Sequence, residues 1–214
     1  MLAYSALNDM VLKNVPVSAI KILDVGCGTG MMGKALKEQY RNRIIYGITY
    51  SNKEAAIAEE FLDKVFVVDI NNSVPGTNIK FDCILFSHVL EHTYYPELVL
   101  GNYLKLLSEE GIVVIALPNI LYYKQRFQFL KGAFKYSPNG GLMDVTHFRF
   151  FDWQTAQEMI KNSGLKIVSK EVSGNFPLPL IRKTVPPLGK FADRVSLKFW
   201  PGLFAFQFVF VAKR

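Results

Sequence analysis

The first candidates for chemistry are the histidines, of which the 214-residue chain has three: His88, His92 and His147. Two of them lie in the segment HVLEH (88–92), together with Glu91. Histidine can act as a general base near neutral pH, and histidine and glutamate are common metal ligands. The order HxxEH resembles a zinc-protease motif, but that motif requires a helix. Here it directly follows an apolar run typical of a strand, which disfavours a protease.

A glycine-rich turn is the second candidate. It lies in ILDVGCGTG (22–30) and directly follows an apolar run. Its glycines are Gly26, Gly28 and Gly30. Glycine tolerates positive φ and lets backbone N–H groups approach a ligand closely. Gly28, Gly30 and Gly33 also satisfy GxGxxG, but a dinucleotide site would need an acid at the end of the second strand. Thr49 holds that position, so the turn alone leaves the ligand open.

Alternating strands and helices must position these residues. Apolar runs typical of buried strands span 21–25, 43–49, 64–70, 81–87 and 111–119. Segments between them have the apolar spacing of helices, and Ser51 to Glu54 reads as a capping box. Such alternation predicts a parallel sheet covered by helices on both faces. Ligands of these sheets bind beyond the carboxyl ends of the strands, where both candidate segments fall.

The alternation of strands and helices ends after residue 119. Residues 120–150 are rich in aromatics and cations, and a helix follows with Asp152 as N-cap. Two further strands are expected at 165–172 and 203–214. We expect a single domain, 1–214, in which 120–150 is a lid insertion and 175–202 a Pro-rich insertion between the last two strands.

Four motifs carry a family resemblance. LDVGCGTG, VVDI, FDCILFSHVLEH and ALPN, in this order and spacing, resemble those of class I S-adenosylmethionine-dependent methyltransferases. The resemblance implies an α/β fold with a three-layer, doubly wound, Rossmann-like sheet of seven mostly parallel strands. The implied order is 3-2-1-4-5-7-6, with strand 7 antiparallel. It also implies S-adenosylmethionine as the cofactor and S-adenosylhomocysteine as the product.

The resemblance also implies a set of cofactor residues. These are Asp24, Gly26, Cys27, Gly28, Gly30, Thr49, Tyr50, Asp69, Ile70 and Ser87. The glycine turn would hold the methionine part of the cofactor, with Asp24 beneath it. Asp69 would accept a hydrogen bond from the adenine amino group, since a carboxylate only accepts. Ile70 would pack on the adenine ring.

Thr49 departs from the family pattern, in which an acid usually binds both ribose hydroxyls. A hydroxyl can make one such bond but no charged bidentate pair. Weaker cofactor affinity, or a substitute from Tyr50 or Ser51, is therefore implied.

Within this resemblance His88, His92 and His147 are the expected catalytic residues. His88 or His92 would line the methyl-transfer pocket, or else form a hydrogen-bonded turn. His147 would be a general base oriented by Asp144, or an anchor of the lid. Some quinone O-methyltransferases carry ExxEH here and hold magnesium with it. His88 replaces the first glutamate and magnesium prefers carboxylate oxygen, so no metal is expected.

The acceptor class rests on a narrower resemblance. Residues 117–165 and the ending PGLFAFQFVFVAKR resemble the MetW-like and surface-glycan-associated branch of the family. This implies a small-molecule, sugar or glycolipid acceptor and O-methylation. The alternatives are a MetW-like cofactor-binding partner protein without its own transfer activity, or a nucleic-acid methyltransferase. No RNA-binding module or dense Lys/Arg run is present, which disfavours nucleic acid.

Composition sets the remaining expectations. Two cysteines, no signal-peptide pattern and no apolar run long enough for a membrane span favour a cytoplasmic protein. The net charge is +7, and much of the excess lies after residue 175. That segment carries Arg182, Lys183, Lys190, Arg194, Lys198, Lys213 and Arg214 against one acid, Asp193. It could contact an anionic membrane surface peripherally, or simply favour solubility.

Overall fold

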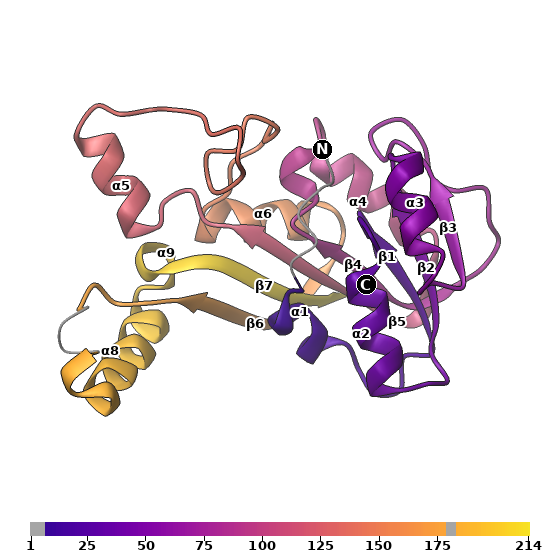
Figure 1. The fold of residues 1–214 in the computed structure, drawn as a ribbon, viewed down its shortest axis with the longest axis horizontal. Helices are drawn as coiled ribbons and strands as arrows, with labels where there is room; N and C mark the ends of the chain where they lie inside the picture. The colour runs from indigo at the N-terminus through magenta and orange to yellow at the C-terminus, as the bar shows by residue number, and fades with distance from the viewer. Residues whose placement is uncertain (1–6, 179–182) are drawn as a thin grey trace.

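A single seven-stranded sheet organises the chain in a computed structural model that describes residues 7–178 and 183–214. The strands are β1 (Lys21–Val25), β2 (Ile44–Thr49), β3 (Lys64–Val67), β4 (Phe81–Ser87), β5 (Leu107–Pro118), β6 (Lys166–Gly174) and β7 (Ala205–Lys213). Their order is β3-β2-β1-β4-β5-β7-β6 (Figure 1). The first five strands are mutually parallel, and β7 lies antiparallel between β5 and β6. The expected fold class and strand order are confirmed.

Helices cover both faces of this sheet. They are α1 (Asp9–Asn14), α2 (Met31–Gln39), α3 (Asn52–Ala58), the 3-10 turn η1 (Leu90–His92), α4 (Pro96–Leu104), α5 (Tyr123–Leu130), α6 (Trp153–Asn162), α8 (Pro186–Phe199) and α9 (Pro201–Phe204). One apolar core lies between the sheet and α1, α2 and α3. A second lies between the opposite face and α4 and α6. The central strands are buried on both faces, which explains their unbroken apolar runs.

Three expected boundaries shift. The fifth strand begins at Leu107 rather than at 111, because α4 ends at Leu104. The third strand ends at Val67, so Asp69 and Ile70 follow it rather than belonging to it. The last strand begins at Ala205, because residues 201–204 form the short helix α9. The Pro-rich segment contains α8, which carries proline in its first turn, where a missing backbone N–H breaks no helical hydrogen bond.

Strands β6 and β7 extend the sheet toward one end of the molecule (Figure 1). β6 runs toward α8, and β7 returns from α9, while α5 lies at the same end of the molecule on the other side of the sheet (Figure 1). α2 and α3 lie at the opposite end. Within residues 7–178 and 183–214, no helix is both long and apolar enough to cross a bilayer.

Candidate active site

The glycine turn follows β1 and is tied to the neighbouring strand. The N–H groups of Gly26 and Cys27 both donate to the carbonyl of Ile48, at 2.9 Å. Gly26, Gly28 and Gly30 all have positive φ, between 52° and 83°. A Cβ on Gly26 would lie 2.3 Å from Val89 Cγ2, whereas one on Gly28 would meet no atom within 4 Å. The turn is therefore packed against the protein at Gly26 and open at Gly28, which suits a ligand lying against its backbone.

Asp24 lies just before this turn and is 2 % exposed. Its Oδ2 has no hydrogen-bond partner among the described residues. Burial raises the pKa of the Asp24 carboxyl to about 7. A buried carboxylate without a partner is costly, and a cationic group bound at the turn would relieve that cost. The ammonium group of a methionine moiety has this chemistry, so the turn fits the expected cofactor.

Cys27 can offer only its backbone to a ligand at the turn. Its side chain is buried beneath the turn, and a Cβ on Gly47 of β2 would lie 2.6 Å from its Sγ. Burial, followed by the nearby carboxylates of Asp24 and Glu54, raises the pKa of the Cys27 thiol well above its ordinary range. Cys27 and Cys83 are both buried free thiols.

A carboxylate of α3, that of Glu54, lies against the end of β2. The Thr49 hydroxyl donates a 2.7 Å hydrogen bond to Glu54 Oε2. Both residues are buried, with exposed fractions of 4 % for Thr49 and 2 % for Glu54. Ser51 caps α3 by accepting from the N–H of Glu54, while its own N–H donates to Thr49 Oγ1. Tyr50 is 75 % exposed. Glu54 therefore brings an acid beside the position where the family usually has one.

The expected adenine residues lie beyond β3. Asp69 is exposed and accepts hydrogen bonds from the N–H of Asn71 at 2.9 Å and from Asn72 Nδ2 at 2.7 Å. Ile70 is half-buried. Ser87 is the last residue of β4 and is also half-buried. The carboxylate of Asp69 keeps further lone pairs for an adenine amino group, so its predicted role stays open.

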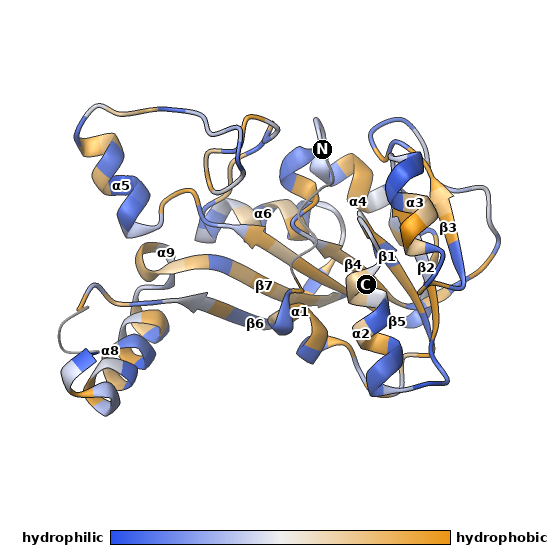
Figure 2. Cartoon of the chain, viewed as in Figure 1, coloured by the Kyte–Doolittle hydropathy of each residue, from blue (hydrophilic) through white to orange (hydrophobic). Residues whose placement is uncertain are grey.

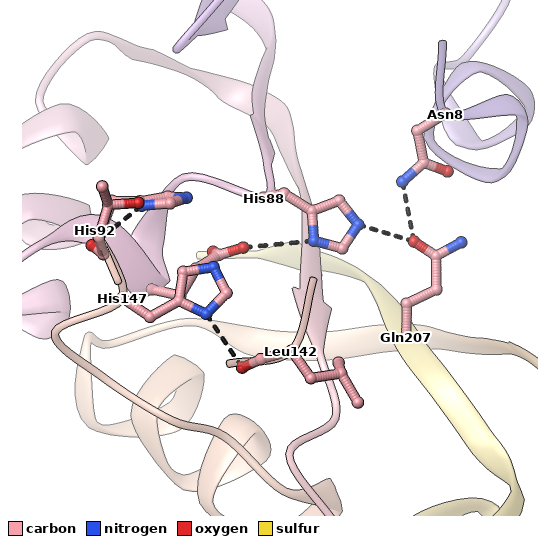
Figure 3. Close-up of polar contacts among 8 residues, drawn as sticks. Asn8, His88, His92, Leu142, His147 and Gln207 are labelled. Carbon is pink, nitrogen blue, oxygen red and sulfur yellow. Dashed lines mark hydrogen bonds and ion pairs between the residues drawn. The ribbon is translucent and has the colours of Figure 1, made fainter. Parts of the chain in front are cut away.

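His88 follows β4 and has a φ of 55°, a rare conformation for a residue other than glycine. Its Nδ1 lies 3.3 Å from Glu91 Oε1, and its Nε2 lies 2.8 Å from Gln207 Oε1 (Figure 3). Asn8 Nδ2 donates to that same Gln207 oxygen. Burial alone would lower the pKa of His88. The hydrogen bond and the charge of Glu91 and the hydrogen bond to Gln207 outweigh that effect, so the pKa of His88 lies above its ordinary value. Both ring nitrogens face acceptors, so His88 is a poor general base.

The other two histidines, His92 and His147, contact each other beside Glu91. One ligand atom each from Glu91, His92 and His147 lies within 4.8 Å of the others. The two imidazole rings contact each other edge to face, with centroids 4.7 Å apart. The carbonyl of Glu91 accepts from the N–H groups of Phe148 and Arg149, which fastens residues 148–149 to η1. HVLEH and residues 120–150 thus come together.

His147 is 9 % exposed, and its Nδ1 lies 3.3 Å from the carbonyl of Leu142 (Figure 3). Burial lowers the pKa of His147; Glu91 opposes that change, and His92 adds to it. Asp144, the expected partner of His147, instead accepts from the N–H and hydroxyl of Thr146. His147 is therefore a neutral base candidate that a backbone carbonyl orients.

Comparisons with known proteins identify the family. A model described as "Methyltransferase domain" matches residues 3–170. An uncharacterized protein of Methanocaldococcus jannaschii is 29% identical over 90% of this chain and 75% of its own length. A ubiquinone biosynthesis O-methyltransferase of Pelagibacter ubique is 28% identical over 73% of this chain and 62% of its own length. A solved S-adenosylmethionine-dependent methyltransferase of Mesorhizobium loti is 17% identical, with a TM-score of 0.62 and 96% of each chain covered. The chain therefore belongs to the methyltransferase domain family and is an S-adenosylmethionine-dependent methyltransferase.

Proposed function

We propose that this methyltransferase methylates a hydroxyl oxygen of a small-molecule, sugar or glycolipid acceptor. The observation that carries the proposal is the cluster of Glu91, His92 and His147 at the carboxyl end of β4. A doubly wound sheet binds its ligands at this edge. The glycine turn after β1 lies at the same edge, because β1 and β4 are adjacent and parallel. Donor and acceptor would therefore meet above β1 and β4.

The cofactor would lie along the carboxyl ends of β1, β2 and β3. The turn backbone and Asp24 would hold its methionine part, Glu54 with Thr49 its ribose, and Asp69 with Ile70 its adenine. When bound, the cofactor supplies a methyl group on a positively charged sulfur. The protein chiefly has to align an acceptor with that methyl group and exclude water.

An oxygen acceptor must also lose its proton, and the cluster can take it. His147 donates Nδ1–H to the carbonyl of Leu142, which leaves the lone pair of Nε2 for the acceptor hydroxyl. The lowered pKa of His147 keeps the ring neutral near pH 7. As the acceptor oxygen takes up the methyl group, its proton would pass to Nε2 of His147. The O-methyltransferase name of the Pelagibacter relative supports an oxygen acceptor.

A lipid-linked acceptor is favoured by the surface at the α5–α8 end of the molecule. Large apolar side chains are exposed there: Phe127, Leu130 and Phe134 near α5, and Leu188, Phe191, Phe199 and Trp200 at α8. Figure 2 shows apolar and hydrophilic residues mixed along both helices. Lys131 and Lys198 lie over exposed phenylalanine rings. Exposed aromatics beside cations are typical of helices that lie in the surface of an anionic bilayer. Arg182, also expected in this basic segment, lies outside the described residues.

Transfer of a labelled methyl group tests the proposed function. The full chain is incubated with labelled S-adenosylmethionine and separate acceptors: a free sugar, a glycolipid in vesicles, a quinol, an amine and RNA. We expect label in an O-methyl product of one hydroxyl acceptor, and at least 100-fold slower labelling after His147→Ala. Methylation of RNA or of the amine would contradict the proposal. Tight cofactor binding without transfer to any acceptor would instead favour a cofactor-binding partner protein.

A further inference from the structure

We propose that Glu91, His92 and His147 form a binding site for a divalent transition-metal ion with the ligand preferences of zinc. Two residues come from η1, directly after β4, and the third from residues 120–150. Their ligand atoms lie within 4.8 Å of one another. The proposal concerns cation binding and does not depend on the identity of the methyl acceptor.

The carboxylate of this cluster has a buried oxygen without a partner among the described residues. Glu91 is 1 % exposed, and its Oε1 lies 3.3 Å from His88 Nδ1. Its other oxygen, Oε2, has no hydrogen-bond partner among the described residues. Leaving a buried carboxylate oxygen without a partner is costly, and a bound cation removes that cost. His88 meanwhile fixes the orientation of the carboxylate through Oε1.

The hydrogen bonds of both imidazoles leave one nitrogen of each free to bind a metal. His147 Nδ1 faces the carbonyl of Leu142 at 3.3 Å, and His92 Nδ1 faces that of Thr146 at 3.1 Å. Each Nδ1 therefore carries the proton, and each Nε2 keeps its lone pair. Metal-binding histidines almost always donate their second N–H to a carbonyl or carboxylate in this way.

Asp144 fixes the tautomer of His92 through one intermediate residue. The Thr146 hydroxyl lies 2.7 Å from Asp144 Oδ1 and 3.0 Å from His92 Nδ1. Its single proton goes to the carboxylate, so its oxygen can only accept from His92. Asp144, expected to orient His147, therefore acts on His92 through Thr146.

Two imidazole nitrogens and one carboxylate favour zinc or a similar transition metal over magnesium, which prefers oxygen ligands. The expectation of no metal was based on His88 replacing a glutamate. In the structure, however, His88 is not one of the proposed ligands, because acceptors occupy both of its nitrogens. Zinc bonds of about 2.0–2.2 Å place ligand atoms about 3.3 Å apart, so small side-chain rotations would close the site. Three protein ligands leave an open position for water or an acceptor oxygen.

Cation binding and proton abstraction by His147 exclude each other, because both use the lone pair of Nε2. A bound cation would therefore change how an acceptor oxygen is activated. For this reason binding is measured first without cofactor or acceptor.

The test is titration of the full, chelator-treated chain with Zn²⁺ by calorimetry, together with the visible absorption spectrum of added Co²⁺. We expect one ion per chain and a Co²⁺ spectrum typical of nitrogen and oxygen ligands. Glu91→Gln, which keeps the side-chain shape, His92→Ala and His147→Ala should each weaken Zn²⁺ binding at least 100-fold. Circular dichroism melting would show that each variant is folded.

Two control variants define the ligand set. Glu97→Gln makes the same chemical change at an exposed position of α4 and should bind Zn²⁺ like the parent protein. His88→Gln should still bind one ion per chain, because His88 contacts Glu91 at Oε1 and leaves Oε2 for the ion. Absence of Zn²⁺ binding by the parent chain would overturn the proposal. So would unchanged binding by folded Glu91→Gln or His147→Ala, or loss of the ion in folded His88→Gln.

Discussion

The Thr49 hydroxyl donates a 2.7 Å hydrogen bond to the carboxylate of Glu54, at the end of β2 beside the glycine turn. This bond uses the only proton of the hydroxyl, and the N–H of Ser51 already donates to its oxygen. Thr49 therefore has little capacity left to bind two ribose hydroxyls. The carboxylate of Glu54, which only accepts hydrogen bonds, is therefore the ribose-binding group that we propose at this position.

Glu54→Gln should weaken S-adenosylhomocysteine binding about 10-fold or more, since hydrogen bonds to a charged group contribute about 1.5–3 kcal/mol. Calorimetry measures the affinity, and melting without ligand shows whether the variant is folded. Glu60→Gln makes the same change at an exposed position just after α3 and should bind normally. Parent-like affinity in Glu54→Gln would remove Glu54 from the ribose site.

Asp24→Asn should stabilise the ligand-free protein at pH 8 while weakening cofactor binding. The folded-state pKa of about 7 lies above the ordinary value of 3.8, so the folded state holds the proton more tightly. Stability therefore falls as pH rises from about 4 to about 7, by up to about 4 kcal/mol. Asparagine cannot ionise and escapes this loss. Thermal melts at pH 4 and pH 8 check the effect: the difference between variant and parent should be small at pH 4 and large at pH 8. A gain of the same size at both pH values would exclude Asp24 ionisation as the cause.

Asp69→Ala should weaken cofactor binding by about 1–3 kcal/mol, because the adenine amino group would lose a charged hydrogen-bond acceptor. The carboxylate also accepts from Asn71 and Asn72, so the substitution can loosen that turn as well. Asn72→Ala removes one of these turn bonds but keeps the carboxylate, and it separates the two effects. If both variants lose affinity equally, Asp69 acts through the turn and not on adenine.

The strands of the sheet follow from the sequence pattern, because each buried strand reads as an unbroken apolar run, whereas the strand order follows from the family resemblance of the motifs. The hydrogen-bond partners of the site residues could not be predicted from the sequence, because they depend on the direction in which each side chain points. Glu54 reads as half of a capping box, yet its carboxylate turns back to Thr49, five residues earlier. His147 is placed by its motif, but its partner is a backbone carbonyl, which sequence cannot distinguish from the nearby Asp144.

Membrane contact is testable by cosedimentation of the full chain with vesicles. Leu130→Ala and Trp200→Ala should each reduce binding to anionic vesicles several-fold, because these side chains are 84 % and 58 % exposed at the α5–α8 end. Leu98→Ala is the matched control, since Leu98 is 60 % exposed on α4. Binding should fall with added salt, because surface charges are screened. Equal loss in all three variants, or equal binding to neutral vesicles, would contradict an anionic membrane partner at this end.

His147→Ala should lower kcat by about 10²–10⁴-fold, the usual contribution of a general base, and leave S-adenosylhomocysteine affinity unchanged. The pH profile of the chelator-treated parent protein gives a second measurement. The neutral ring is the active form, so kcat/KM should be flat at high pH and fall as the ring gains a proton. Burial lowers the pKa of His147, which places this fall below the ordinary value of about 6.5. Glu91 opposes that lowering, so Glu91→Gln should move the fall to still lower pH. A rise in acceptor KM with little change in kcat would instead show that His147 anchors residues 120–150 and takes no part in proton transfer.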